Sequence, residues 1–225
     1  MKQILLFAAV MAVASIASAG TCVPGTLQDY INLGASGCQS GLAMFTGFTT
    51  EPGQNAATPI DPSLVFVTPS GSTLNSTLQF TLNSTASANQ LFESFFRFEV
   101  MATAPLSDTM FLNGSATGDG AATATQDICP GGSFMGNSPV GCPGSAGSLV
   151  TAATESFTMQ SDTASFPISS FFDVFVDLSV DGGLSGTATL TSATAQFTAT
   201  PEPGTTALML TGLAALALRR LRRVF

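Results

Sequence analysis

The residues of this 225-residue chain that could do chemistry are mainly carboxylates and cysteines. Between residues 20 and 200 there are thirteen carboxylates and one basic residue, Arg97, and this part contains neither His nor Lys. Serine and cysteine triads need a base, usually His or Lys, so these mechanisms are excluded. A carboxylate pair could still hydrolyse a glycosidic bond, but thirteen acids make some pair unavoidable. We therefore assign no catalytic residue and expect a non-enzymatic protein, with a carboxylate-pair glycoside hydrolase as an alternative.

Metal binding by the acids is the next possibility. Asp173, Asp177 and Asp181 share one face of a strand, but each step of four residues spans about 13 Å, which is too far for one ion. Asp119 and Asp181 lie in Gly-rich loops that could bind Ca²⁺, although no EF-hand loop is present. Acidic strand faces more often keep edges from aggregating. We expect no metal and no cofactor.

The N-terminus has the layout of a secretory signal peptide. Lys2 precedes an apolar run from Ile4 to about Ala14, and Ala17-Ser18-Ala19 supplies the small residues of a cleavage site. This order predicts cleavage by signal peptidase after Ala19, and hence export. A buried N-terminal helix is the alternative.

Export places the four cysteines in an oxidising compartment, where disulfides persist. Four cysteines allow three pairings. Their grouping into two close pairs favours local bonds, Cys22–Cys38 and Cys129–Cys142. A zinc site with four Cys ligands would want tighter spacing. Each small loop would add about 3 kcal/mol to stability in the chain-entropy model.

The part from residue 40 to 200 alternates apolar and polar side chains with a period of two, which predicts strands. In 171–180 the apolar set is Phe172, Val174, Val176, Leu178 and Val180, with Asp173, Phe175, Asp177 and Ser179 opposite. Residues 90–102 place Phe92, Phe96, Phe98 and Val100 inward, and Glu93, Arg97 and Glu99 outward. Residues 73–85 place Leu74, Leu78, Phe80 and Leu82 together. Strands every 10–20 residues predict an all-β fold, an antiparallel β-sandwich.

Three local features refine this fold. The apolar set in 184–200 moves from Ala188 and Leu190 to Ala193, Ala195 and Phe197, which predicts a bulge. Residues 26–34 predict a short helix, capped by Thr26 and ending before Gly34. Thr187, Thr189 and Thr191 could form a flat array, as in ice-binding surfaces, but one row of three is typical of a plain strand exterior.

The charge balance excludes one class of partner. Thirteen carboxylates against Arg97 give the middle part a net charge near −12. Such a surface repels nucleic acid and anionic lipid, so we expect no nucleic-acid partner.

The C-terminus combines three elements in order. Pro201-Glu202-Pro203 precedes an apolar run from Thr205 to Leu218, and Arg219, Arg220, Arg222 and Arg223 follow. As a helix, the 14-residue run would span about 21 Å, which is short of the hydrocarbon core of a membrane. The arginines should hold this end in the cytoplasm. We expect a transient anchor in the inner membrane, with the domain outside and Phe225 inside; a buried core helix is the alternative.

This tail resembles the PEP-CTERM sorting signal of Gram-negative bacteria, which is also catalogued as an ice-binding protein C-terminal motif. The resemblance covers about 25 residues. It implies recognition by an exosortase near Pro201-Glu202-Pro203, and display at the cell envelope or outside the cell. Residues 21–38, with Cys129 and Cys142, are also similar to uncharacterised PEP-CTERM proteins.

The expected organisation has three parts: a signal peptide (1–19), an extracytoplasmic β-sandwich domain (20–200) and the sorting signal (201–225). The expected function is that of a non-enzymatic surface or matrix protein. A carbohydrate-binding or adhesive module, with exopolysaccharide as its partner, is the first alternative.

Overall fold

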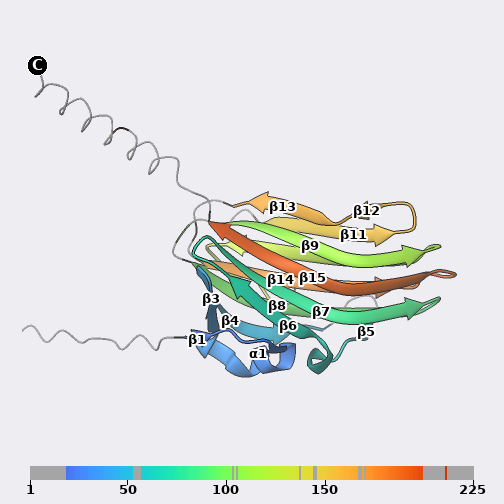
Figure 1. Ribbon diagram of the computed structural model, residues 1–225, viewed down its shortest axis with the longest axis horizontal. Coiled ribbons are helices and arrows are strands. Elements are labelled where there is room, and N and C mark those ends of the chain that lie inside the picture. The colour runs from blue at the N-terminus through green and yellow to red at the C-terminus, as the bar shows by residue number, and fades with distance from the viewer. Residues whose placement is uncertain are drawn as a thin grey trace, which may run out of the picture.

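The computed structural model contains two packed β-sheets (Figure 1). It describes residues 19–52, 57–102, 104, 106–136, 138–143, 146–166, 169, 171–199 and 211. The predicted fold class, an antiparallel β-sandwich, is confirmed. Pro201, Glu202, Pro203, the four C-terminal arginines and all of the 205–218 run except Thr211 lie outside the described residues. No helix of the described part is both long and apolar enough to cross a membrane.

Sheet A contains nine strands in the order β1-β3-β4-β8-β14-β10-β11-β12, with β5 beside β8. Its central strands β8, β14 and β10 are antiparallel neighbours. The strands are β1 (Gly20–Thr21), β3 (Cys38–Ser40), β4 (Ala43–Thr50), β5 (Thr58–Pro59), β8 (Leu91–Ala102), β10 (Ala121–Pro130), β11 (Gly147–Thr154), β12 (Thr158–Met159) and β14 (Phe171–Asp181).

Sheet B contains six strands in the order β13-β9-β15-β7-β6-β2. They are β2 (Gly25–Thr26), β6 (Phe66–Gly71), β7 (Asn75–Ser87), β9 (Leu106–Thr117), β13 (Ser161–Ser165) and β15 (Thr187–Ala199). The chain changes sheet between most of its successive strands, as in β7-β8-β9-β10 and β13-β14-β15. Strands that are adjacent in sequence therefore lie in different sheets more often than they pair.

The predicted inward faces build the core between the sheets. Phe172, Val174, Val176, Leu178 and Val180 of β14 are all buried, as predicted. Phenylalanine rings from both sheets meet there: the ring centroids of Phe80 and Phe96 are 4.9 Å apart, and those of Phe45 and Phe197 are 5.8 Å apart. Such ring pairs add to the large apolar area that each ring removes from water.

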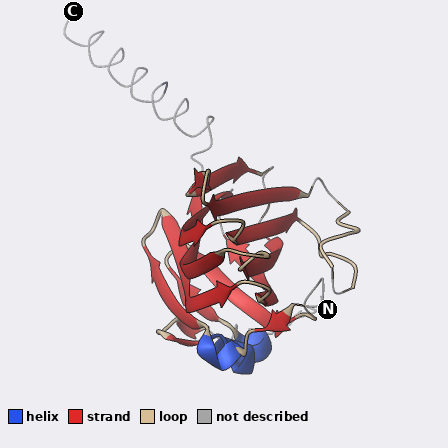
Figure 2. Ribbon diagram, turned by 90° about the vertical axis from the view of Figure 1, so that its right-hand side faces the viewer, coloured by secondary structure: helices blue, strands red, loops and turns tan. Residues whose placement is uncertain are grey.

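The predicted helix is present as α1 (Leu27–Leu33) and lies at one end of the two strand layers (Figure 2). Thr26 caps it through a capping box with Asp29, and Gly34 follows its last residue. Gly34 has φ +56°, a conformation that favours glycine. The helix buries Leu27 and Tyr30, and the Tyr30 ring packs edge-on against Phe48. Two short 3₁₀ turns, η1 (Gly34–Ser36) and η2 (Pro62–Leu64), complete this end.

The strand predictions hold in detail with one correction. The bulge predicted in 184–200 is confirmed by a register shift between Leu190 and Ser192 of β15. The inward placement of Leu74 was wrong, because Leu74 is 64% exposed. It precedes β7, in the turn where the Ser72 N–H donates to the Asn75 carbonyl oxygen, so strand alternation does not extend to it.

Both predicted disulfides, Cys22–Cys38 and Cys129–Cys142, are confirmed. They leave no free cysteine. The first joins the segment after β1 to β3, beside α1. The second closes a loop that follows β10.

A polar pair lies inside the core. Asp108 of β9 and Gln126 of β10 are both buried, and Gln126 Nε2–H donates to Asp108 Oδ2 over 2.7 Å. Asp108 Oδ1 and Gln126 Oε1 have no hydrogen-bond partner. Both are acceptors unless the carboxyl holds a proton, and burial raises the pKa of Asp108 well above 3.8. A protonated Asp108 would supply the donor that Gln126 Oε1 lacks.

Replacing Asp108 by Asn should raise the free energy of unfolding at pH 8 by about 1–3 kcal/mol, because the amide is neutral and can donate to Gln126 Oε1. The folded state holds the Asp108 proton more tightly than the unfolded chain, so wild-type stability should be highest below pH 3.8 and decline as the pH rises above it. The gain should therefore shrink at pH 4.

Urea denaturation at both pH values measures this difference. Replacing the exposed Glu155 by Gln is the control and should change little. A D108N variant less stable than wild type at pH 8 would contradict the interpretation.

Candidate functional site

Half of the charged side chains between residues 20 and 200 lie on the outer face of sheet A. In β8, β14 and β10, the residues that alternate with the core positions point away from sheet B. Those with charge are Glu93, Arg97, Glu99, Asp127, Asp173, Asp177 and Asp181. The sequence prediction placed Glu93, Arg97 and Glu99 outward, and this is confirmed. Asp173 lies on the predicted polar face of β14 but is fully buried, so it does not serve as the edge-protecting surface acid that the sequence suggested.

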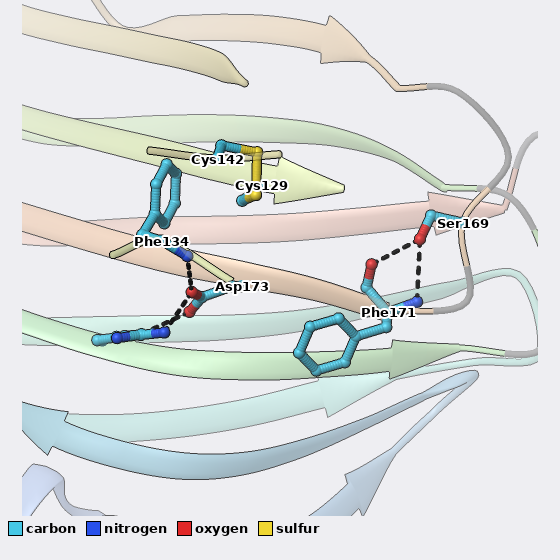
Figure 3. The surroundings of a disulfide bond; sticks show 7 residues. Cys129, Phe134, Cys142, Ser169, Phe171 and Asp173 are labelled. Atoms are coloured by element: carbon cyan, nitrogen blue, oxygen red, sulfur yellow. Dashed lines mark hydrogen bonds and ion pairs between the residues drawn. A yellow bond between two sulfur atoms is a disulfide. The ribbon is translucent and has the colours of Figure 1, made fainter. Parts of the chain in front are cut away.

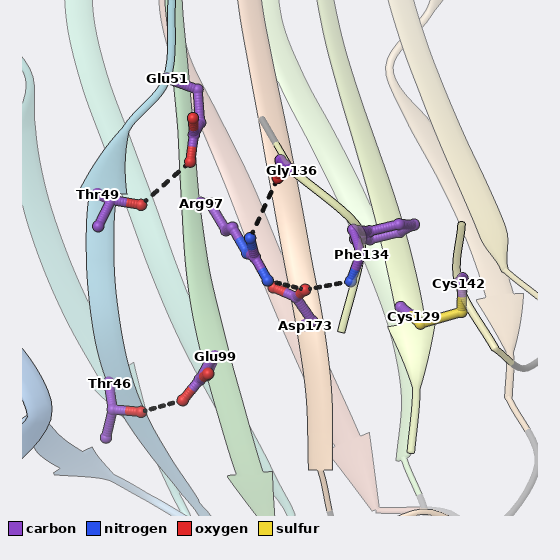
Figure 4. Close-up of polar contacts among 10 residues, drawn as sticks. All are labelled: Thr46, Thr49, Glu51, Arg97, Glu99, Cys129, Phe134, Gly136, Cys142 and Asp173. Atoms are coloured by element: carbon purple, nitrogen blue, oxygen red, sulfur yellow. Dashed lines mark hydrogen bonds and ion pairs between the residues drawn. A yellow bond between two sulfur atoms is a disulfide. The ribbon is translucent and has the colours of Figure 1, made fainter. Parts of the chain in front are cut away.

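Arg97 and Asp173 form a two-pronged ion pair across β8 and β14 (Figure 4). Arg97 Nε donates to Asp173 Oδ1 over 2.7 Å, and Nη2 donates to Oδ2 over 2.5 Å. The Phe134 N–H also donates to Oδ2, over 2.7 Å, and Arg97 Nη1 donates to the Gly136 carbonyl oxygen over 3.4 Å. All polar groups of this pair are thus directed at neighbours within the chain.

The Cys129–Cys142 loop lies against this pair, and its Phe134 N–H points at Asp173 (Figure 3). Phe134 of the loop packs edge-on against Phe175 of β14, with ring centroids 5.4 Å apart, and Phe95 stacks on the same ring at 5.3 Å. The Arg97 guanidinium lies 5.3 Å from the Phe175 centroid, which adds a cation–π contact. Together with the disulfide, these rings make a second, smaller apolar cluster outside the main core.

Replacing Arg97 by Met should lower the free energy of unfolding by about 3–5 kcal/mol, because it leaves a buried carboxylate with one remaining donor. The double variant Arg97→Met with Asp173→Asn should lose less than the sum of the two single variants, since it also removes the buried charge.

Urea denaturation of the four proteins gives the coupling energy. Additive losses would mean that the two side chains do not act as a pair.

Three further carboxylates lie beside the pair on the same face. Glu93 and Asp127 are the diagonal cross-strand neighbours of Asp177. Burial, followed by the charge of Glu93, a hydrogen bond with Glu93 and the charge of Asp127, raises the pKa of Asp177 from 3.8 to about 7. Burial also raises the pKa of Asp127. Among the described residues, neither Asp127 nor Asp177 forms a salt bridge like the one between Arg97 and Asp173.

The spacing of the Glu93–Asp177 pair and the metal-binding potential of these acids can be compared with those of known sites. Glu93 and Asp177 are close enough to share a hydrogen bond, whereas retaining glycosidases hold their carboxyls about 5–5.5 Å apart and inverting ones further. Within the described ranges, no group of three or more His, Cys, Asp or Glu side chains could hold a metal ion. The raised pKa of Asp177 is explained by its burial and by the acids that lie close to it.

Replacing Asp177 by Asn should stabilise the fold at pH 8 by as much as about 4 kcal/mol, with water screening reducing this value. The pKa of Asp177 is raised on folding, so wild-type stability should be complete below pH 3.8 and decline as the pH rises through about 7. At pH 4 the variant and wild type should be nearly equal.

The double variant D108N/D177N separates the two acids by urea denaturation across pH 4–8. If D177N alone kept the full wild-type decline in stability, Asp177 would not be the group responsible.

A hollow of about 750 Å³ opens next to Glu93, between the end of β4, η2 and β8. Its polar lining consists of Gln28, Thr50, Glu51, Asp61, Glu93 and Ser94, and its apolar lining of Pro52, Pro59, Ile60, Pro62 and Phe95. Asp61 is committed to η2, because its carboxylate accepts from the Ser63 N–H over 2.8 Å. The hollow therefore offers an acidic, partly apolar concavity suited to a small hydroxylated or cationic group.

The loop carboxylates considered for calcium have structural roles in the folded chain. Asp119 accepts from the Leu184 and Ser185 N–H groups over 2.8 and 2.9 Å, which joins the β9–β10 and β14–β15 turns. Asp181 accepts from the Gly183 N–H over 2.8 Å. These contacts, with Arg97–Asp173, were missed in the sequence because each depends on which strands become neighbours.

No protein-family model matches the sequence, and no curated protein matches it significantly. Similar solved structures include TmCBM61 in complex with β-1,4-galactotriose, at 12% identity over 53% of this chain and 69% of that chain, with a TM-score of 0.24. The CBM22-1 xylan-binding domain of Paenibacillus barcinonensis Xyn10C is 11% identical over 81% of this chain and 98% of that chain, with a TM-score of 0.28.

The enzymatically active domain of bacteriophage CBA120 tailspike protein 4 is 10% identical over 65% of this chain, with a TM-score of 0.28. The similarity covers only 19% of that chain. At these TM-scores the comparisons assign no site and no ligand to the sandwich.

Proposed function

We propose that this chain is a non-enzymatic exported protein, sorted to the cell surface or extracellular matrix through residues 201–225. The observation that supports it best is the pair of disulfides, which use all four cysteines of the chain. Disulfides of this kind persist in oxidising compartments outside the cytoplasm. They agree with the export signal that ends at Ala19.

The tail acts in this proposal after the domain has crossed the membrane. Signal peptidase removes residues 1–19, the apolar run 205–218 arrests transfer, and the arginines hold the end in the cytoplasm. Exosortase then recognises Pro201-Glu202-Pro203 and cuts nearby. The 14-residue run needs only to hold the chain until it is processed.

A non-enzymatic role for the domain is supported by the way its reactive groups are used. Arg97 and Asp173 are bonded to each other and to the disulfide loop. Glu93 and Asp177 share a hydrogen bond, which brings them closer together than the carboxyl pairs of glycosidases. The other polar side chains at the surface are suited to binding a partner.

Deleting residues 201–225 should release the domain into the medium, because nothing then retains it at the membrane. The matched variant with Ala in place of Pro201, Glu202 and Pro203 keeps the apolar run, so it should stay cell-associated and uncut. Both should be expressed in a host that has an exosortase.

Immunoblots of cell and medium fractions, with the mass of the mature C-terminus, give the readout. If the deleted protein stayed with the cells as fully as the intact chain, the sorting proposal would be wrong.

A further inference from the structure

The outer face of sheet B is uncharged, in contrast to the outer face of sheet A. We define the B face as the outward side chains of β6, β7, β9, β13 and β15. The six strands of sheet B contain two charged residues, Asp108 and Asp162. Asp108 points into the core, and Asp162 accepts from the Val150 N–H of β11 in sheet A. Neither belongs to the B face.

The B face consists almost entirely of hydroxyl and amide groups. The pairing registers align its residues in rows across β13, β9, β15, β7 and β6, such as Thr163-Thr109-Gln196-Thr77-Ser70 and Ser161-Phe111-Thr194-Gln79-Thr68. The alternate residues of the same strands, among them Leu78, Phe80, Met110 and Phe197, are buried in the core. The polar rows must therefore point outward.

Several hydroxyls of the B face are held in fixed positions by their neighbours. Thr85 and Thr189 share a hydrogen bond of 3.0 Å, Thr117 and Thr187 one of 2.8 Å, and Thr109 and Thr163 one of 3.0 Å. A hydroxyl that donates to its neighbour still has lone pairs to accept from a ligand. The β-branched threonines are also stiff, so little side-chain entropy is lost on binding.

Two partly exposed aromatic rings stand among these polar rows. Phe111 of β9 is 39% exposed and Phe66 of β6 is 45% exposed. Two strands, β15 and β7, lie between them, so the rings are about 14 Å apart across the sheet and one row apart along it. That separation fits an extended ligand that bridges both rings better than a single small molecule.

We propose that the B face binds a chain of neutral polysaccharide, with Phe66 and Phe111 packing on sugar-ring faces and the Thr and Gln side chains bonding sugar hydroxyls. This inference rests on the proposed function and names the ligand class of the domain. The charge of the protein surface decides which class of polymer the B face can bind. A net charge near −12 repels anionic polymers, and the B face offers cationic ones no carboxylate to pair with. An uncharged hydroxylated chain meets hydroxyls and amides without burying any ion.

An ice surface is the other flat, hydrogen-bonding ligand that rows of threonine could fit. The register shift between Leu190 and Ser192 breaks the regular spacing of the rows along β15. Phe66 and Phe111 also interrupt a lattice match, whereas sugar rings have apolar faces that accept them. The arrangement therefore favours polysaccharide.

The test is affinity electrophoresis of the full-length oxidised chain in gels that contain a neutral polymer: hydroxyethylcellulose, xylan, galactomannan or dextran. Carboxymethylcellulose is the charged match of the first. We expect retardation in at least one neutral gel and none in carboxymethylcellulose. F66A/F111A should weaken the binding by at least about tenfold, and Thr194→Asp should weaken it similarly by placing a charge between the rings.

Phe157→Ala is the matched control, because Phe157 is 56% exposed but lies outside the B face, beside β12. It should bind as wild type does. Near-ultraviolet circular dichroism of each variant shows whether the fold is kept, and T194D keeps both rings if F66A/F111A does not fold.

Three results would overturn the inference. If folded F66A/F111A and T194D still bind, the B face is not the site. If replacing Glu51 by Gln then abolishes binding, the site is the hollow beside Glu93. If no neutral gel retards the protein, this ligand class is excluded. If the protein shows thermal hysteresis and T194D abolishes it, the B face binds ice and the inference is wrong. Release of the protein truncated after residue 200 would still test sorting separately, so the two proposals can fail independently.

Discussion

The ion pair of Arg97 and Asp173 is the interaction on which the outer side of sheet A depends. Arg97 is the one basic residue between residues 20 and 200, and it lies on a central strand against a carboxylate that has no exposed area. A carboxylate buried to this extent would be costly without a partner, since desolvation of an ion costs several kcal/mol. With Arg97 and the Phe134 N–H in place, Asp173 holds the disulfide loop onto β8 and β14 (Figure 4). At the neighbouring Asp177, burial and then the adjacent acids Glu93 and Asp127 raise the pKa of the carboxyl.

The two outer faces of the sandwich differ in the kind of side chains that they carry. Sheet A collects charge, an ion pair, crowded acids and the disulfide loop. Sheet B presents hydroxyl and amide groups with two aromatic rings. Negative charge on one face repels like-charged polymers. The other face is then free to meet a neutral partner without removing ions from water.

Much of the fold could be predicted from the sequence because its signals are local. Alternation placed the inner residues of β8 and β14, the slip after Leu190 gave the bulge, and Thr26 with Gly34 bounded α1. The close spacing of the cysteines gave both disulfides. Apart from Leu74, which lies in a turn, the features that the sequence did not reveal share one cause. Successive long strands change sheet, so which strands lie side by side is a long-range property that no local pattern contains. The Asp108–Gln126 contact, the burial of Asp173 and the rows of the B face all depend on it.

The short separation of the bonded cysteines has a consequence for the order of assembly. Cys22 and Cys38 are 16 residues apart, and Cys129 and Cys142 are 13 apart. In a chain that crosses a membrane N-terminus first, the first two thiols meet long before the other two emerge, and closing so small a loop is fast. Two of the three possible pairings are thereby avoided by timing alone. Oxidation can then precede the slow joining of distant strands, and a chain in transit never needs to exchange a wrong bond for a right one.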